Sequence, residues 1–136
     1  MSLESLFRSS REGNLLVVTG FIDSGVSPNS ADGYGYTPLM LTAYSGHVSL
    51  VSLLLSYPNI EPNKTNSFGT TAFGYACFGG SVSVVTLLLL DPRVDPTIAD
   101  NHGSTALDNA AWKNHSSVVK LLLDDGRVDP NLICCI

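Results

Sequence analysis

The residues of this chain that could do chemistry are three histidines, three cysteines and twelve acidic residues, and their spacing brings few of them together. Zinc sites use closely spaced pairs of Cys and His, and the one adjacent pair here is Cys134-Cys135. A calcium loop needs about six or more convergent oxygens. The acidic residues around Asp91 and Asp125 lack that pattern and predict a solvated rim. With no nucleophile beside a base and no phosphate-binding glycine loop, the sequence predicts no catalytic residue, no metal site and no cofactor.

A fixed period organises the chain instead. Residues 35–39 (GYTPL) recur 34 positions later as 69–73 (GTTAF) and again as 103–107 (GSTAL). With the same step, residues 51–55 (VSLLL) recur as 85–89 (VTLLL) and 119–123 (VKLLL). A period of this size indicates a stack of small units, each of which buries its apolar face on its neighbours. Such stacks present a long contact surface for partners.

Each period contains signals for two helices and a turn. Thr37 can cap the first helix, because its hydroxyl can accept from the free N–H groups of the first turn. The pattern predicts that this helix covers residues 38–45 and ends at Gly46, and that a second helix covers 48–57. His47 is expected to cap the loop between the two. Residues 61–69 are rich in turn formers and predict a hairpin-like connection.

These motifs resemble the ankyrin repeat. The resemblance rests on Gly35-x-Thr37-Pro38-Leu39, Ala43-x-x-Gly46-His47, Val51-x-x-Leu54-Leu55 and Pro62-Asn63. It implies two antiparallel helices and a projecting β-hairpin in each unit, stacked into a curved solenoid. The expected fold is therefore all-α with short β-hairpin loops. We predict one domain, residues 1–136, with repeats at about 1–33, 34–67, 68–101 and 102–136, the first a terminal capping copy.

The chain departs from the family pattern at one informative position. The motif's histidine is replaced by Met40, Gly74 and Asp108. That histidine typically ties adjacent hairpins together, so we expect its hydrogen-bond network to be absent. Glycine within a helix also costs about 1 kcal/mol relative to alanine. The third repeat, which contains Gly74, is therefore expected to be the least stable layer.

Composition excludes several classes of partner and places the chain in a reducing compartment. The net charge is −5, and no cluster of basic residues offers the footprint that nucleic acids need. The longest apolar runs are far shorter than the roughly 20 residues of a membrane span. Cysteine usage fits a reducing environment, so we expect the cytoplasm or the nucleus. The acidic balance weakly favours a partner of basic character.

The repeat register places large aromatic residues in columns on the expected concave face. One column holds Tyr34, Phe68 and His102, and another holds Tyr44, Phe78 and Trp112. Aromatic side chains are enriched at binding hot spots. The predicted partner-binding residues are Tyr34, Tyr36, Tyr44, Phe68, Phe78, His102, Trp112 and Lys113. In the alternative interpretation, each ring packs on its neighbour and only stabilises the stack.

We therefore expect a non-catalytic adaptor that binds a segment of a partner protein through its concave face. A second hypothesis follows from the apolar last repeat, which ends at Leu132-Ile133-Cys134-Cys135-Ile136 without a polar cap. In that case the chain is a segment of a longer ankyrin array or associates with itself through this end. A third hypothesis makes the array a targeting module for a catalytic domain outside this sequence.

Overall fold

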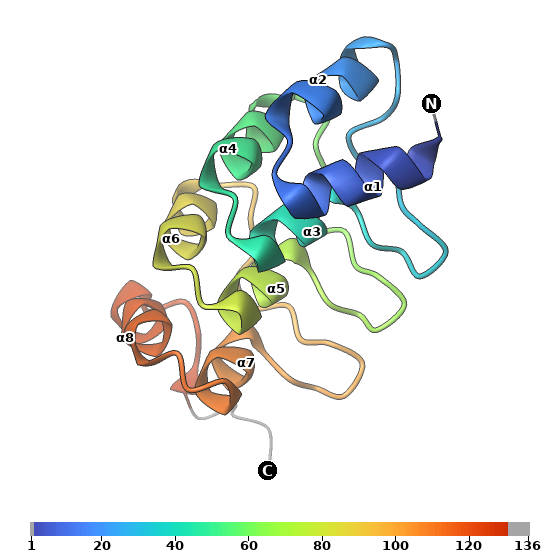
Figure 1. The fold of residues 1–136 in the computed structure, drawn as a ribbon. Helices are drawn as coiled ribbons and strands as arrows, with labels where there is room; N and C mark the ends of the chain where they lie inside the picture. Colours follow the sequence, from blue (N-terminus) through green and yellow to red (C-terminus); the bar gives the residue numbers. More distant parts are fainter. Residues whose placement is uncertain (1, 131–136) are drawn as a thin grey trace.

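The computed structural model describes residues 2–130, which form an array of eight α-helices in four antiparallel pairs (Figure 1). The helices are α1 (Leu3–Glu12), α2 (Leu15–Asp23), α3 (Pro38–Ser45), α4 (Val48–Ser56), α5 (Ala72–Gly79), α6 (Val82–Leu90), α7 (Ala106–Trp112) and α8 (Ser116–Asp125). The first helices of the pairs form one layer and the second helices another, and long loops project beside the first layer (Figure 1). The all-α solenoid predicted from the repeat is confirmed. Cys134-Cys135 and the apolar end of the chain lie outside the described residues.

Capping threonines begin the first helices of the last three pairs, as the sequence predicts. The Thr37 hydroxyl accepts from the Met40 N–H at 3.3 Å, and Thr71 accepts from the Gly74 N–H at 3.1 Å. Thr105 forms a full capping box, in which the Asp108 carboxylate also accepts from the Thr105 N–H at 2.8 Å. Each such cap stabilises its helix by about 1 kcal/mol. The second helix of the first full copy ends one residue before its predicted limit, because Tyr57 is already extended.

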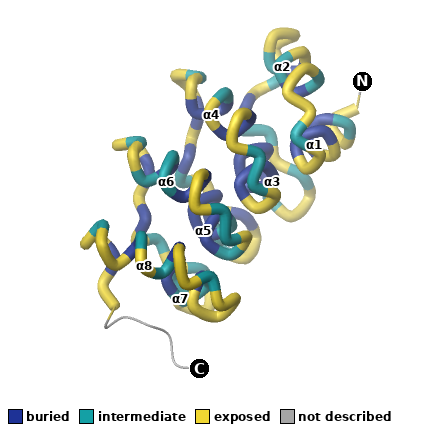
Figure 2. The backbone as a smooth tube through the Cα atoms, turned by 60° about the vertical axis from the view of Figure 1, so that its left-hand side comes forward, coloured by how far each residue is buried: buried dark blue, intermediate teal, exposed yellow. Residues whose placement is uncertain are grey.

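The core lies between the two layers. Leu39, Phe73 and Leu107 hold equivalent positions on the first helices, and each is only 2 % exposed. Their partners on the second helices, such as Leu54 and Leu88, are also buried. Figure 2 shows the buried segments on the facing sides of the helices and the exposed ones along loops and outer edges. Burial of each large apolar side chain contributes about 1.5–3 kcal/mol, so consecutive layers stabilise one another.

The projecting loops are hairpin-shaped turns, and no residue between 2 and 130 is assigned to a strand. In the turn between the second and third repeats, the Asn66 N–H donates to the Thr70 carbonyl at 3.2 Å. Asp32 and Asp100 close the neighbouring turns in the same way. Each turn is too short for a β-ladder. Adjacent turns are joined without the family's histidine. The Ser67 N–H donates to the Tyr34 carbonyl at 2.9 Å, and the Ser67 hydroxyl donates to the same carbonyl at 2.8 Å.

Two histidines bridge the repeats along the ends of the first helices. Nε2 of His47 lies 2.7 Å from the Arg11 carbonyl oxygen, and Nε2 of His115 lies 2.9 Å from the Phe78 carbonyl oxygen. Carbonyl oxygens only accept, so in both rings Nε2 carries the proton and donates. The expectation that His47 caps its own interhelical loop is wrong. Its side chain makes no cap hydrogen bond, because the ring reaches back to the preceding repeat.

An arginine on each of two outer loops also crosses to the preceding repeat. Arg93 donates to the Leu55 carbonyl at 2.6 Å and pairs with Asp91 at 2.7 Å. Arg127 donates to a carbonyl at the end of α6 at 2.9 Å and pairs with Asp125 at 2.7 Å. Hydrogen bonds from these guanidinium groups lower the pKa values of Asp91 and Asp125. Both carboxylates therefore orient a bridging arginine, a role beyond the solvated rim that the sequence predicts.

The histidine bridge can be tested at Gly80, whose φ of +80° favours glycine. A Cβ there would lie 2.5 Å from the His115 ring, so alanine would push the ring from the Phe78 carbonyl. Gly103 is a matched control, because its φ is +81° and a Cβ added to it would have no atom within 4 Å beyond its two chain neighbours. Both alanine variants carry the left-handed penalty of about 1–2 kcal/mol. We expect Gly80→Ala to lose a further 1–3 kcal/mol or so of unfolding free energy in urea. Equal losses in the two variants would rule out the bridge.

Candidate protein-binding surface

Five aromatic rings from two repeats form a continuous series on the face made by the first helices and the loops. We call these residues the aromatic ladder: Phe68, Tyr36, Tyr75, Tyr44 and Phe78. The centroids of successive rings lie 6.5, 5.6, 6.1 and 5.7 Å apart in that order. The last pair, Tyr44 and Phe78, is stacked at 27°. Such spacings are typical of attractive ring pairs, so the ladder is a connected surface.

The closeness of the Tyr44–Phe78 stack depends on Gly79. This residue ends α5, and a Cβ at its position would overlap the carbonyl group of Tyr44 on α3. Any larger residue would therefore push α5 away from α3. The close approach of the two helices brings rings 34 positions apart in the chain into contact.

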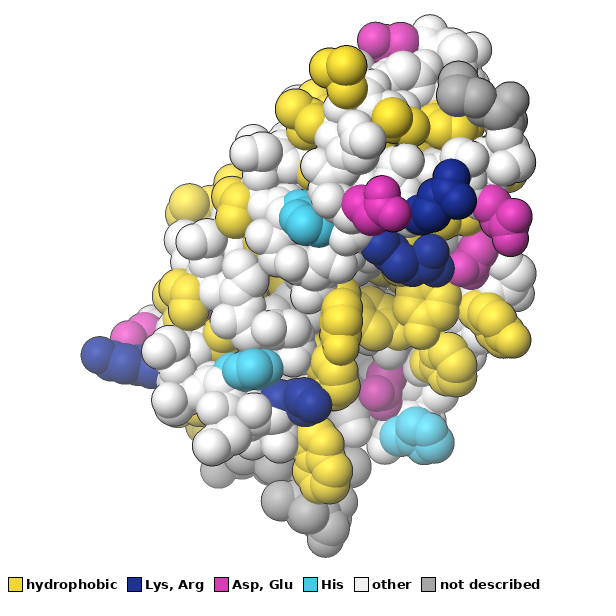
Figure 3. Space-filling model, in the orientation of Figure 1, with side chains coloured by type: hydrophobic (Ala, Val, Ile, Leu, Met, Phe, Trp, Pro, Cys, Tyr) yellow, Lys and Arg dark blue, Asp and Glu magenta, His cyan; other side chains and the backbone are white. Residues whose placement is uncertain are grey.

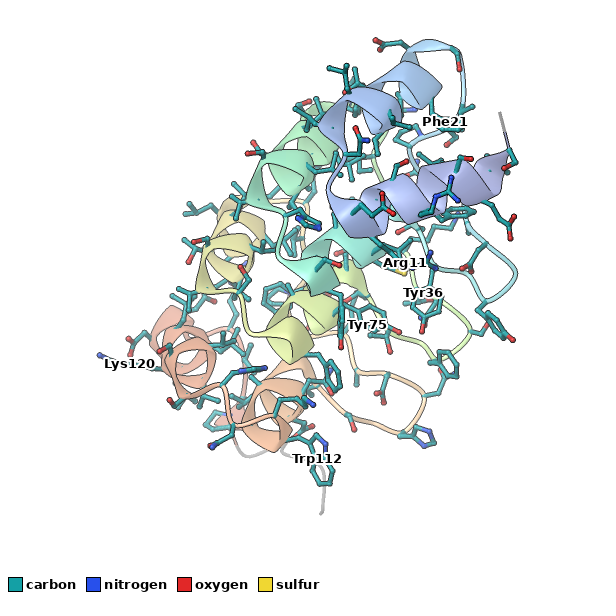
Figure 4. The ribbon with its side chains drawn as sticks, in the orientation of Figure 1. Arg11, Phe21, Tyr36, Tyr75, Trp112 and Lys120 are labelled. Atoms are coloured by element: carbon teal, nitrogen blue, oxygen red, sulfur yellow. The ribbon has the colours of Figure 1, made fainter. Side chains whose placement is uncertain are left out.

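The ladder differs from the vertical columns expected from the register. Tyr44 and Phe78 stack as expected, whereas Tyr36 contacts Phe68 diagonally and no ring contact joins Tyr34 to Phe68 among the described residues. Trp112 also lies apart from the ladder, at the far end of the array (Figure 4). It is the last residue of the short helix α7.

The other predicted residues, Tyr34, His102, Trp112 and Lys113, are all exposed. Tyr34 is 66 % exposed and Trp112 is 72 % exposed. His102 is exposed at a loop tip. The Lys113 ammonium group, next along the chain from Trp112, lies 5.0 Å from the centroid of the Phe78 ring. Lys113 thereby makes a cation–π contact with one end of the ladder.

Tyr75 is the member of the ladder that the sequence prediction missed. In the repeat register it aligns with Leu41 and Asn109, so no recurring aromatic column marks it. The sequence feature that could have identified Tyr75 is its spacing to Phe78, because residues three apart on a helix are neighbours on its surface. Tyr75 contacts both Tyr36 and Tyr44 and thus joins the loop rings to the helix rings.

A chain of hydrogen bonds sets the direction of the tyrosine hydroxyl groups. Oδ1 of the buried Asn66 accepts from the Phe68 and Thr70 N–H groups at 3.0 and 3.1 Å. Its amide nitrogen must therefore face Tyr75, and it donates to the Tyr75 hydroxyl at 2.8 Å. Tyr75 in turn donates to the Tyr36 hydroxyl at 3.1 Å. The hydrogen of the Tyr36 hydroxyl has no acceptor among the described residues, so it remains available to a ligand.

Two adjoining pockets lie along the ladder and share two of its residues, and we call the two together the groove. The larger, of about 440 Å³, is lined by Arg11, Tyr36, Met40, Leu41, Tyr44, Ser45, Tyr75 and Phe78. The smaller, of about 210 Å³, is lined by Phe68, Thr70, Gly74, Tyr75, Phe78, Asp100 and Asn109. Tyr75 and Phe78 line both pockets, so the groove crosses from the first repeat to the fourth. Figure 3 shows hydrophobic side chains gathered in a strip on this face, with both basic and acidic side chains beside it.

Comparison with known proteins assigns the array to a family. A family model described as ankyrin repeats, in three copies, matches residues 6–100 and again 58–133. The chain belongs to the ankyrin repeat family. Proteins of this family generally act as protein–protein interaction modules and are typically non-catalytic. The groove is therefore a candidate contact surface for a protein.

A curated relative also contains ankyrin repeats. The "Ankyrin repeat-containing protein P1E11.10" of Schizosaccharomyces pombe is 37 % identical to this chain over 51 residues. The match covers 38 % of this chain and 25 % of that protein. This ankyrin repeat chain thus corresponds to only part of that relative's length.

Other kinds of site find little support in the described part of the chain. None of the helices between residues 2 and 130 is both long enough and apolar enough to cross a bilayer. Within the same range, no three His, Cys, Asp or Glu side chains come together as a group that could hold a metal ion. Cys77 is fully buried, and burial raises the pKa of its thiol.

The hydrogen-bonded state of Tyr75 can be tested by titration. Burial and the bond donated to Tyr36 raise the pKa of Tyr75 to about 12, above the ordinary value of about 10. The raised value contributes stability that is complete below pH 10 or so and is lost as the pH rises through the folded pKa. We expect the tyrosinate absorbance of wild type minus that of Tyr75→Phe to have its midpoint near 12. A midpoint at the ordinary tyrosine pKa would contradict this bonding.

Proposed function

We propose that this ankyrin repeat array is a non-catalytic adaptor that holds an extended segment of a partner protein in the groove along the aromatic ladder. The contact residues are those predicted from the sequence, which are Tyr34, Tyr36, Tyr44, Phe68, Phe78, His102, Trp112 and Lys113, joined by Tyr75. On composition, we place the adaptor in the cytoplasm or the nucleus.

The exposed area of the rings is the observation that carries this proposal. Tyr44 is 49 % exposed and Phe68 is 51 % exposed, although both belong to the ladder. Rings that served only to stabilise the stack would gain more by being covered, since burial of apolar area contributes about 25 cal/mol per Å². A partner segment laid in the groove would cover this area. The part of that gain left after ordering of the segment would appear as affinity.

A second candidate function concerns the end of the array. Leu123 on α8 is 45 % exposed, which favours association of the last repeat with another chain or a second copy. The match to one quarter of a longer ankyrin repeat protein agrees with a role as part of a larger array. Self-association and a targeting role for a separate catalytic domain stay predictions from the sequence.

The adaptor proposal is tested by replacing Tyr44, Phe78 and Trp112 together with alanine. The matched control replaces Leu16, Val48 and Leu90, which are exposed on second helices and line neither groove pocket. Random peptides selected on the wild type supply the ligands, and fluorescence anisotropy measures their affinity. Because hot-spot rings contribute about 2 kcal/mol or more each, we expect about a hundredfold loss or more in the groove variant.

The control variant should bind within about twofold of wild type, since surface substitutions away from the site change little. Urea unfolding of all three proteins shows whether a lost affinity reflects lost folding. Unchanged binding by a folded groove variant would refute the adaptor proposal at this surface.

A further inference from the structure

The larger pocket of the groove combines an apolar wall with two hydrogen-bond donors. Met40, Tyr44 and Phe78 are among the residues of the apolar wall. Arg11 lies in the last turn of α1, and its exposed guanidinium forms no ion pair with any described residue. Tyr36 also lines the pocket, and Figure 4 shows Arg11, Tyr36 and Tyr75 directed toward the same region.

The orientation of the hydroxyl chain makes Tyr36 a donor rather than an acceptor toward a ligand. Its oxygen already accepts from Tyr75, and Tyr75 accepts from Asn66. The hydrogen of the Tyr36 hydroxyl is therefore the group left to bond. A guanidinium group can only donate hydrogen bonds, so Arg11 and Tyr36 both require a hydrogen-bond acceptor from the ligand. The ligand group that satisfies two such donors best is a carboxylate, which only accepts and forms strong charge-assisted bonds.

We propose that the larger pocket recognises an Asp or Glu side chain of the bound segment, together with a neighbouring apolar side chain. This inference rests on the proposed adaptor function and specifies the partner's chemistry. The carboxylate accepts from the Arg11 guanidinium and the Tyr36 hydroxyl. The apolar side chain covers Tyr44 and Phe78.

The shape and charge of the groove favour a side-chain carboxylate over the carboxyl terminus of a partner. The groove does not end at the larger pocket but continues past Tyr75 and Phe78 into the smaller one. A segment can therefore run through it. The smaller pocket contains Asp100, which repels a carboxylate, so the acidic residue belongs at the α1 end. The net charge of −5 suggested a basic partner, but the groups around the larger pocket favour an acidic residue there.

Selection from a library of short random peptides on three proteins tests the inference. The proteins are the wild type, Arg11→Glu and the matched control Arg8→Glu, which changes an exposed arginine of the same helix that does not line the pocket. We expect wild type and Arg8→Glu to enrich Asp or Glu beside an apolar residue. Arg11→Glu is expected to enrich Lys or Arg at the same place instead, because its pocket then attracts the opposite charge.

Fluorescence anisotropy with one enriched peptide measures the contribution of each donor to the affinity separately. Arg11→Glu and Tyr36→Phe should each weaken binding about tenfold or more, since hydrogen bonds to charged groups are strong. Tyr57→Phe is the control for Tyr36→Phe, because Tyr57 follows the last residue of α4 and lines neither pocket of the groove. It should leave binding unchanged. Amidation of the peptide's carboxyl terminus should also change nothing.

Each contrary outcome has a definite meaning. If wild type enriches peptides without acidic residues, or Arg11→Glu selects the same peptides as wild type, the carboxylate inference fails and the adaptor proposal stands. Loss of binding on amidation would assign the pocket to a terminal carboxylate and overturn the choice of a side chain. If wild type enriches no peptide at all, the adaptor proposal and the inference fail together.

Discussion

Hydrogen bonds and packing that cross from one repeat to the next hold the layers of this protein in register. On the first-helix side, His115 donates to the Phe78 carbonyl of the preceding repeat. On the outer loops, Arg93 reaches back to the carbonyl of Leu55. Between the turns, a backbone bond joins Ser67 to the preceding loop. These contacts recur at a fixed step in the chain, and the buried residues between the layers add the apolar stabilisation. Equal steps then place side chains from different repeats on one continuous wall.

The groove is a direct consequence of that register. Tyr44 and Phe78 meet because α3 and α5 approach closely, and Tyr75 connects them to Tyr36 on the neighbouring loop. The buried Asn66 fixes the direction of the hydroxyl chain through its own turn. A surface organised in this way before a partner arrives loses little entropy on binding, which favours affinity. The hydrogen bonds of Asn66 that shape the loop thus also leave the hydroxyl hydrogen of Tyr36 as the donor that the groove presents to a ligand.

The 34-residue period made the stacked layers predictable from the sequence. The groove was less predictable, because the period does not show which side chains of neighbouring repeats point toward one another. The capping role of Thr37 follows from the rules of helix capping, and the structure confirms it. Tyr75 was missed because it recurs in no other repeat, so only contacts between layers reveal its position. The ring of His47 was assigned to the wrong loop for a similar reason, since its partner belongs to another repeat. The partner-binding role of Trp112 stays a prediction, and the structure places this residue apart from the ladder, at the far end of the array.

Mapping of amide chemical shifts by nuclear magnetic resonance, with a selected peptide added stepwise, tests the central claim most directly. If the stacked repeats form one preorganised binding wall, the shifts should change along the first helices and turns around Arg11, Tyr44 and Tyr75. The amides of α2, α4, α6 and α8 should change little. Changes concentrated on those second helices, or confined to a single repeat, would contradict a groove built across the layers.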